Sequence, residues 1–143
     1  MSRILIVDDE ESIRRSLSGI LSDEGFETSS AADRDAAFSA LEGDGAPDLV
    51  LLDINMPGID GLEVVSRLKD SHPKLPVLIL TMHEEAQYVV RAIEAGAMGY
   101  LTKQSAPEQL VTAIRRIYDG QRYITDEATE ALALRIARGA QAK

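Results

Sequence analysis

Leu49-Val50-Leu51-Leu52-Asp53 gives the strongest indication of the fold, because four consecutive aliphatic residues are followed directly by an aspartate. A segment that is apolar at every position, without alternation, is typical of a strand buried on both faces, as in a parallel sheet. The same pattern occurs in Ile4-Leu5-Ile6-Val7 before Asp8-Asp9 and in Val77-Leu78-Ile79-Leu80 before Thr81. These blocks predict a parallel sheet whose central strands each end at a polar residue.

Two weaker strands and five helices are predicted around these blocks. The weaker strands are Phe26-Glu27-Thr28 and Ala97-Met98-Gly99-Tyr100-Leu101, the second of which precedes Thr102-Lys103. Apolar residues at helical spacing, bounded by capping and stop residues, predict the helices. The predicted helices cover residues 12–21, 33–41, 62–69, 85–95 and 107–118, with stops at Gly25, Gly96 and Gly120.

The alternation of strand and helix predicts an α/β fold. Short connections and right-handed crossovers then favour a doubly wound, five-stranded parallel sheet in a flavodoxin-like three-layer sandwich. We expect the strand order 2-1-3-4-5, which places ligand binding beyond the carboxyl ends of the first and third strands. We expect residues 1–120 to form this domain and residues 121–143 a linker, in which Ala128, Leu132 and Ile136 predict an extra helix at about 126–138.

Composition narrows the classes of function. The 143-residue chain has a formal net charge of −9, so we expect it to bind DNA poorly by itself, since DNA binding relies on Lys and Arg. It has no cysteine, which excludes disulfides and thiolate metal sites. No apolar run is long enough for a leader or a membrane span. These features fit a cytoplasmic protein that has no membrane partner.

Polar residues follow four of the five predicted strands. Asp8 and Asp9 follow the first, Asp53 the third, Thr81 the fourth and Lys103 the fifth. The carboxyl ends of parallel strands share one edge of the sheet, so these side chains should converge there. Clustered carboxylates need compensation, for which Mg²⁺ is the simplest candidate, and a lysine can hold a phosphate oxygen. The set therefore predicts phosphoryl transfer to a carboxylate.

Each residue also has a simpler interpretation. Asp53 could be a turn residue, Asp8 and Asp9 could cap the first helix, and Thr81 could cap the fourth. Tyr100 could be a half-buried core residue. The convergence of several such positions on one edge favours the functional interpretation.

These residues, with Asp53-Ile54-Asn55-Met56-Pro57-Gly58, resemble the receiver domains of two-component response regulators over about residues 3 to 120. The resemblance implies that Asp53 accepts a phosphoryl group from a sensor histidine kinase. It implies Mg²⁺ bound by Asp8, Asp9, Asp53 and the backbone carbonyl of Asn55. It also implies that Thr81 and Lys103 contact the phosphoryl group, and that Thr81 and Tyr100 act as switch residues.

The segments at Gly99-Tyr100-Leu101-Thr102-Lys103 and Gly120-Gln121-Arg122-Tyr123-Ile124 look most like the NarL/FixJ subfamily. This resemblance implies a helix-turn-helix DNA-binding domain that follows residue 143 in the full-length protein. Many receivers have proline after the lysine, where this chain has Gln104. A cis peptide before a residue other than proline costs several kcal/mol, which puts the usual cis geometry at Lys103 in doubt.

We therefore expect a phosphorylation-dependent switch rather than a turnover enzyme, read out by partner binding or by homodimerisation. One alternative is a stand-alone receiver that acts through protein contacts. A second is a Mg²⁺-dependent aspartyl-phosphate phosphatase, but such enzymes usually have Asp two residues after the nucleophile, where this chain has Asn55. A flavodoxin-type binding domain is disfavoured by the acidic residues after the first strand.

Overall fold

Strands and helices alternate along the part of the chain that the computed structural model describes, which is residues 3–42, 46–54, 61–81, 86–103, 107–123 and 134. For residues 86–89 only the backbone is described. The elements are β1 Arg3–Val7, α1 Glu11–Asp23, β2 Glu27–Ala31, α2 Arg34–Ala40, β3 Leu49–Asp53, α3 Gly61–Ser71, β4 Val77–Thr81, α4 Ala86–Ala95, β5 Gly99–Thr102 and α5 Pro107–Tyr118.

The five strands form one parallel sheet in the order β2-β1-β3-β4-β5, which confirms the predicted order. The central strands β1, β3 and β4 coincide with the three aliphatic blocks. The weaker strands were predicted less well, because β2 extends to Ala31 and β5 begins only at Gly99. β2 and β5 are the edge strands of the sheet and contain fewer aliphatic residues. The first and last residues of such strands are harder to predict from the sequence, because less of an edge strand is buried.

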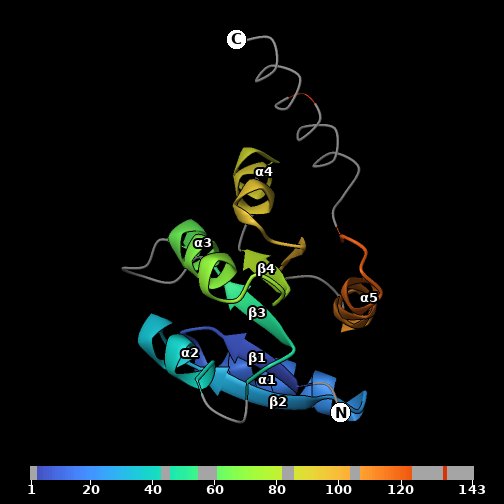
Figure 1. The fold of residues 1–143 in the computed structure, drawn as a ribbon. Helices are drawn as coiled ribbons and strands as arrows, with labels where there is room; N and C mark the ends of the chain where they lie inside the picture. Colours follow the sequence, from blue (N-terminus) through green and yellow to red (C-terminus); the bar gives the residue numbers. More distant parts are fainter. Residues whose placement is uncertain are drawn as a thin grey trace.

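Each central strand divides its side chains between two hydrophobic cores. Val50 and Leu52 of β3 lie in one core with residues of α2, α3 and α4, whereas Leu49 and Leu51 lie in the other with residues of α1 and α5. Figure 1 shows α2 and α3 on one side of the sheet and α5 on the other. The fold is therefore the predicted three-layer sandwich, and burial on both faces explains the unbroken aliphatic runs.

The helix boundaries follow the capping and stop signals. The Asp33 side chain accepts a hydrogen bond of 2.8 Å from the Ala36 N–H at the start of α2. The predicted stops at Gly25, Gly96 and Gly120 are confirmed, because each has a positive φ of 83° to 123° that side chains disfavour.

The segment after α5 returns to the outer edge of β5. The Tyr123 N–H donates to the Met98 carbonyl at 3.0 Å, and the Tyr100 N–H donates to the Tyr123 carbonyl at 3.1 Å. Tyr123 forms an isolated parallel bridge with Gly99, so the edge of β5 is partly covered. The helix predicted at 126–138 lies outside the described residues except for Leu134. Among the described helices, each is too short or too polar to cross a bilayer.

Candidate functional site

The carboxyl ends of β1, β3, β4 and β5 bring the predicted site residues to one edge of the sheet. Asp53 is the last residue of β3 and Thr81 the last of β4, while Asp8 follows β1 and Lys103 follows β5. The side chains of Asp8 and Asp53 are completely buried, and Thr81 is 4% exposed. Charged residues are rarely buried in this way unless they have partners, so this edge is a candidate site.

Lys103 joins the two buried carboxylates. Its Nζ atom lies 2.9 Å from Asp53 Oδ2 and 3.2 Å from Asp8 Oδ2, and the lysine side chain is only 9% exposed. The Lys103 N–H donates to the Thr81 carbonyl at 2.9 Å, which fixes the backbone from which the side chain extends. Residues from three strand ends thus meet at a single ammonium group, as the sequence predicted.

The electrostatics show a cluster with excess negative charge. Burial raises the pKa of Asp8 above its ordinary value, and the neighbouring Asp53 raises it further, against the hydrogen bond from the Glu10 N–H and the ion pair with Lys103. Burial by itself would lower the pKa of Lys103, but its ion pairs with Asp53 and Asp8 outweigh burial and raise that pKa. Lys103 is therefore a firmly charged cation that cannot balance both carboxylates when they are ionised.

Asp8, Asp9 and Glu10 could hold a metal ion. A carboxylate oxygen from each of these residues lies within 4.8 Å of the others. Asp8 is buried, while Asp9 and Glu10 are exposed, so a bound ion would have both protein ligands and access to water. Three carboxylates with room for water suit a hard divalent cation such as Mg²⁺.

Sequence reasoning missed Glu10 as a member of the site. Its Oε1 atom lies 3.7 Å from Lys103 Nζ, and its N–H donates to Asp8 Oδ1 at 2.9 Å. Its place directly after Asp8-Asp9 was the only available signal, because the contact with Lys103 depends on the tertiary fold.

Gly61 is a second residue whose importance the sequence did not reveal. A Cβ atom at this position would lie 2.5 Å from Ile54 Cβ and 2.7 Å from Ile54 Cα. The first residue of α3 therefore packs directly on the residue that follows Asp53. Glycine is required at this position by the close approach of the two backbones.

The two predicted switch residues occupy different places. Thr81 lies at the site edge, where its strand position pairs with Thr102 of β5. Tyr100 is 3% exposed and packs in the core on the side of α2, α3 and α4. Its side chain therefore belongs to the hydrophobic core.

Some predicted features fall outside the described residues. These are the carbonyl of Asn55 and the peptide between Lys103 and Gln104. They stay predictions from the sequence.

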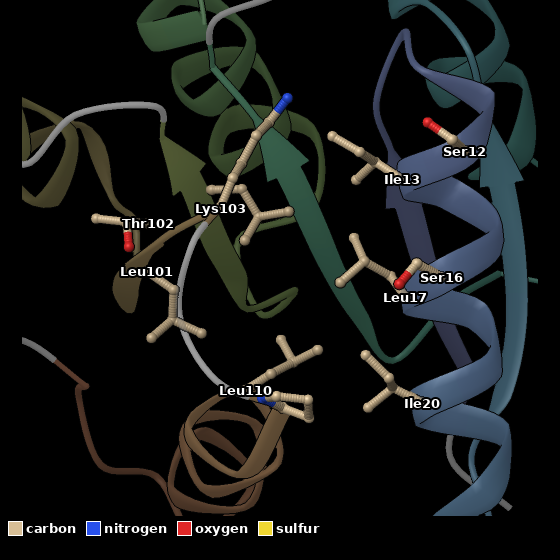
Figure 2. A pocket seen from close by; sticks show the side chains of 11 residues that line it. Ser12, Ile13, Ser16, Leu17, Ile20, Leu101, Thr102, Lys103 and Leu110 are labelled. Atoms are coloured by element: carbon tan, nitrogen blue, oxygen red, sulfur yellow. The ribbon is translucent and has the colours of Figure 1, made fainter.

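An apolar groove of about 270 Å³ runs from Lys103 between α1 and α5. Figure 2 shows Ile13, Leu17 and Ile20 of α1 facing Leu101 and Leu110, with Lys103 at the end nearest Ile13. Leu17 and Ile20 are partly buried against the core on this face. The groove thus offers an apolar contact surface directly beside the charged cluster.

Comparisons with known proteins give a consistent family. The model of the response regulator receiver domain matches residues 4–115. The chain is 39% identical over 136 residues to the response regulator GacA of Pseudomonas aeruginosa, covering 94% of this chain and 64% of that protein. It is 37% identical over 135 residues to the response regulator UvrY of Escherichia coli K12, covering 94% of this chain and 62% of that protein.

A solved structure agrees with these sequence relatives. The crystal structure of a two-component response regulator of the LuxR family from Aurantimonas sp. SI85-9A1 superposes with a TM-score of 0.83 at 31% identity. The match covers 96% of this chain and 99% of that chain. The chain spans less than two thirds of the length of the curated relatives GacA and UvrY.

Proposed function

This chain belongs to the response regulator receiver domain family of two-component systems, and we propose that Asp53 is its phosphoacceptor. The observation that carries the proposal is the buried contact of 2.9 Å between Asp53 Oδ2 and Lys103 Nζ, beside the carboxylates of Asp8, Asp9 and Glu10. A sensor histidine kinase is the proposed donor. The apolar groove beside Lys103 gives a protein donor a surface that a small-molecule donor would not use.

The proposed reaction is a transfer between a phosphohistidine and a carboxylate. A carboxylate oxygen of Asp53 forms a bond to phosphorus while the phosphorus–nitrogen bond of the donor breaks, and the electron pair returns to the imidazole. Lys103 holds a phosphoryl oxygen through its ammonium group, and the Thr81 hydroxyl donates to another. Water later cleaves the acyl phosphate, which returns Asp53 to a carboxylate and releases phosphate.

Asp8, Asp9 and Asp53 are the proposed side-chain ligands of Mg²⁺, with the Asn55 carbonyl as a further protein ligand. Their fit is supported by the all-oxygen donor set and by the excess of buried carboxylate over ammonium charge. When bound, Mg²⁺ supplies positive charge that offsets the phosphoryl oxygens. Asp8 and Asp9 then serve as fixed anions that hold the ion next to Asp53.

The proposed output is a conformational switch rather than turnover of a substrate. A phosphoryl group adds nearly two negative charges beside Lys103 and Thr81. Thr81 would move toward it and Tyr100 would repack in the core, shifting an equilibrium between two states. In the full-length protein we propose control of transcription through a helix-turn-helix domain, in the cytoplasm. A stand-alone receiver, or dimerisation on phosphorylation, is the alternative readout.

Beryllofluoride, a phosphoryl mimic, tests the switch. We expect its addition with Mg²⁺ to shift the amide NMR signals of Asp53, Thr81 and Lys103, and to shift those around Tyr100. The Asp53→Asn variant, which lacks the acceptor carboxylate, should show no such shift. Unchanged spectra of the unsubstituted protein would contradict the proposed function.

A further inference from the structure

The backbone carbonyl of Asp8, directly after the end of β1, accepts a hydrogen bond from a side chain. β1 ends at Val7, and the Asp8 N–H still donates to the Ala31 carbonyl of β2 at 3.1 Å. The Asp8 carbonyl instead accepts a hydrogen bond of 2.6 Å from Nη1 of Arg14, a half-buried residue in the first turn of α1. A buried carbonyl without such a donor would be costly, so this contact holds the loop in one conformation.

The carbonyl that Arg14 binds belongs to the peptide between Asp8 and Asp9. The orientations of the Asp8 and Asp9 side chains depend on this peptide to different extents. The Asp8 side chain is held by the Glu10 N–H and by Lys103, whereas the Asp9 side chain is exposed. The orientation of Asp9 toward the other carboxylates therefore depends on its backbone. Arg14 fixes the plane of the peptide from which Asp9 extends.

We infer that Arg14 is a positioning residue for the Mg²⁺ site, acting through the Asp8–Asp9 peptide without contacting the ion. The inference rests on the proposed function, since it assumes that Asp8 and Asp9 bind Mg²⁺. Groups that orient metal ligands through hydrogen bonds commonly change metal affinity about 10-fold to 100-fold when they are removed.

The loss of charge and the loss of positioning predict opposite effects of Arg14→Ala on Mg²⁺ affinity. Removal of a positive charge near a cation site would, by charge alone, strengthen Mg²⁺ binding. Loss of the hydrogen bond to the Asp8 carbonyl would instead weaken it, because Asp9 would no longer be held toward the ion. The direction of the change in affinity therefore separates the two effects.

Arg15 is the matched control. It is the next residue of α1, and its side chain is 79% exposed and pairs with Glu11 at 2.8 Å. Arg15→Ala removes the same charge from the same helix without touching the Asp8 carbonyl. Arg14→Lys retains a donor and the charge, and tests whether a conservative side chain restores the site.

The experiment is a Mg²⁺ titration of the 143-residue chain by isothermal calorimetry, with amide NMR following Asp9 and Glu10. We expect Arg14→Ala to weaken Mg²⁺ binding about tenfold, Arg14→Lys to recover part of the loss, and Arg15→Ala to bind within about twofold of the unsubstituted protein. Melting temperatures in EDTA show separately how much each substitution affects the metal-free fold.

Equal or tighter Mg²⁺ binding by Arg14→Ala would overturn the inference and leave the proposed function standing. The same holds if Arg14→Ala lowers the melting temperature but not the affinity, because Arg14 would then be only structural. Absence of Mg²⁺ binding by the unsubstituted protein would overturn the proposed function together with the inference.

Discussion

At the level of single residues, we expect the Asp8 carboxylate to destabilise the metal-free protein. Its carboxylate is completely buried next to Asp53, and both share the ammonium group of Lys103. Burial of carboxylates in excess of their cation is unfavourable unless further charge compensates them. We therefore expect a divalent cation, if bound at the proposed site, to raise the free energy of unfolding.

Asp8→Asn should stabilise the protein in EDTA by about 1–2 kcal/mol at neutral pH, because it removes a buried charge while keeping the side-chain shape. Folding raises the pKa of Asp8 above its ordinary 3.8, so the unfolded chain loses this proton first as pH rises. The stability of the unsubstituted protein therefore falls, relative to Asp8→Asn, as pH rises from about 3.8 through the pKa of the folded state.

Chemical denaturation of both proteins between pH 3 and pH 8 would measure this difference. The advantage of Asp8→Asn should vanish below about pH 3.8, where Asp8 is protonated in both states. Asp9→Asn is the control, since Asp9 is exposed and its removal should change metal-free stability little. A destabilised Asp8→Asn protein in EDTA would contradict this account of the cluster.

At the level of secondary-structure elements, the first residue of α3 packs closely on the residue that follows β3. A side chain at Gly61 would collide with Ile54, the residue after Asp53. We expect Gly61→Ala to lower the free energy of unfolding by about 1–3 kcal/mol, because the clash must move backbone. Gly19→Ala in α1, where an added Cβ meets nothing, should leave stability equal or slightly higher.

Thermal or chemical unfolding of the two variants gives the comparison. Amide NMR should place the largest shifts of Gly61→Ala around Ile54 and Asp53. Equal stability of Gly61→Ala and the unsubstituted protein would mean that α3 and β3 do not approach as closely as the structure shows.

The pairing of β5 with the segment at 121–123 depends on a second glycine. A Cβ at Gly99 would lie 2.4 Å from the Tyr123 carbonyl oxygen, and its nearest contacts are all with Tyr123. Gly99→Ala should therefore push this segment from the edge of β5, breaking the two hydrogen bonds at Met98 and Tyr100.

Hydrogen exchange would detect the loss of pairing. In Gly99→Ala we expect faster exchange of the Tyr100 and Tyr123 amides, with the amides of β3 unchanged because β4 lies between. Gly19→Ala again serves as the control. Retained protection of both amides in Gly99→Ala would show that the segment at 121–123 is held by other contacts.

At the scale of the whole molecule, sheet order and site location could be predicted because both follow from local pattern. Aliphatic blocks predict buried strands, and the rules of doubly wound sheets place their polar ends together. Asp8, Asp53 and Lys103 met as expected for that reason.

Other contacts could not be predicted, since they join residues whose neighbours are set only by packing. The roles of Gly61, Gly99 and Arg14 depend on distances between elements. No pattern of residues in the sequence indicates these distances. Tyr100 was predicted as a switch only by resemblance, and its burial in the core is compatible with a packing role as well.

Asp53 is proposed as a Mg²⁺-dependent phosphoacceptor, and chemical phosphorylation can test this. The experiment is incubation with acetyl phosphate and Mg²⁺, followed by borohydride reduction of the acyl phosphate and peptide mass mapping. We predict one modified residue, Asp53, with no modification in EDTA or in Asp53→Asn. Modification of another residue, or full modification of Asp53→Asn, would mean that Asp53 is not the phosphoacceptor.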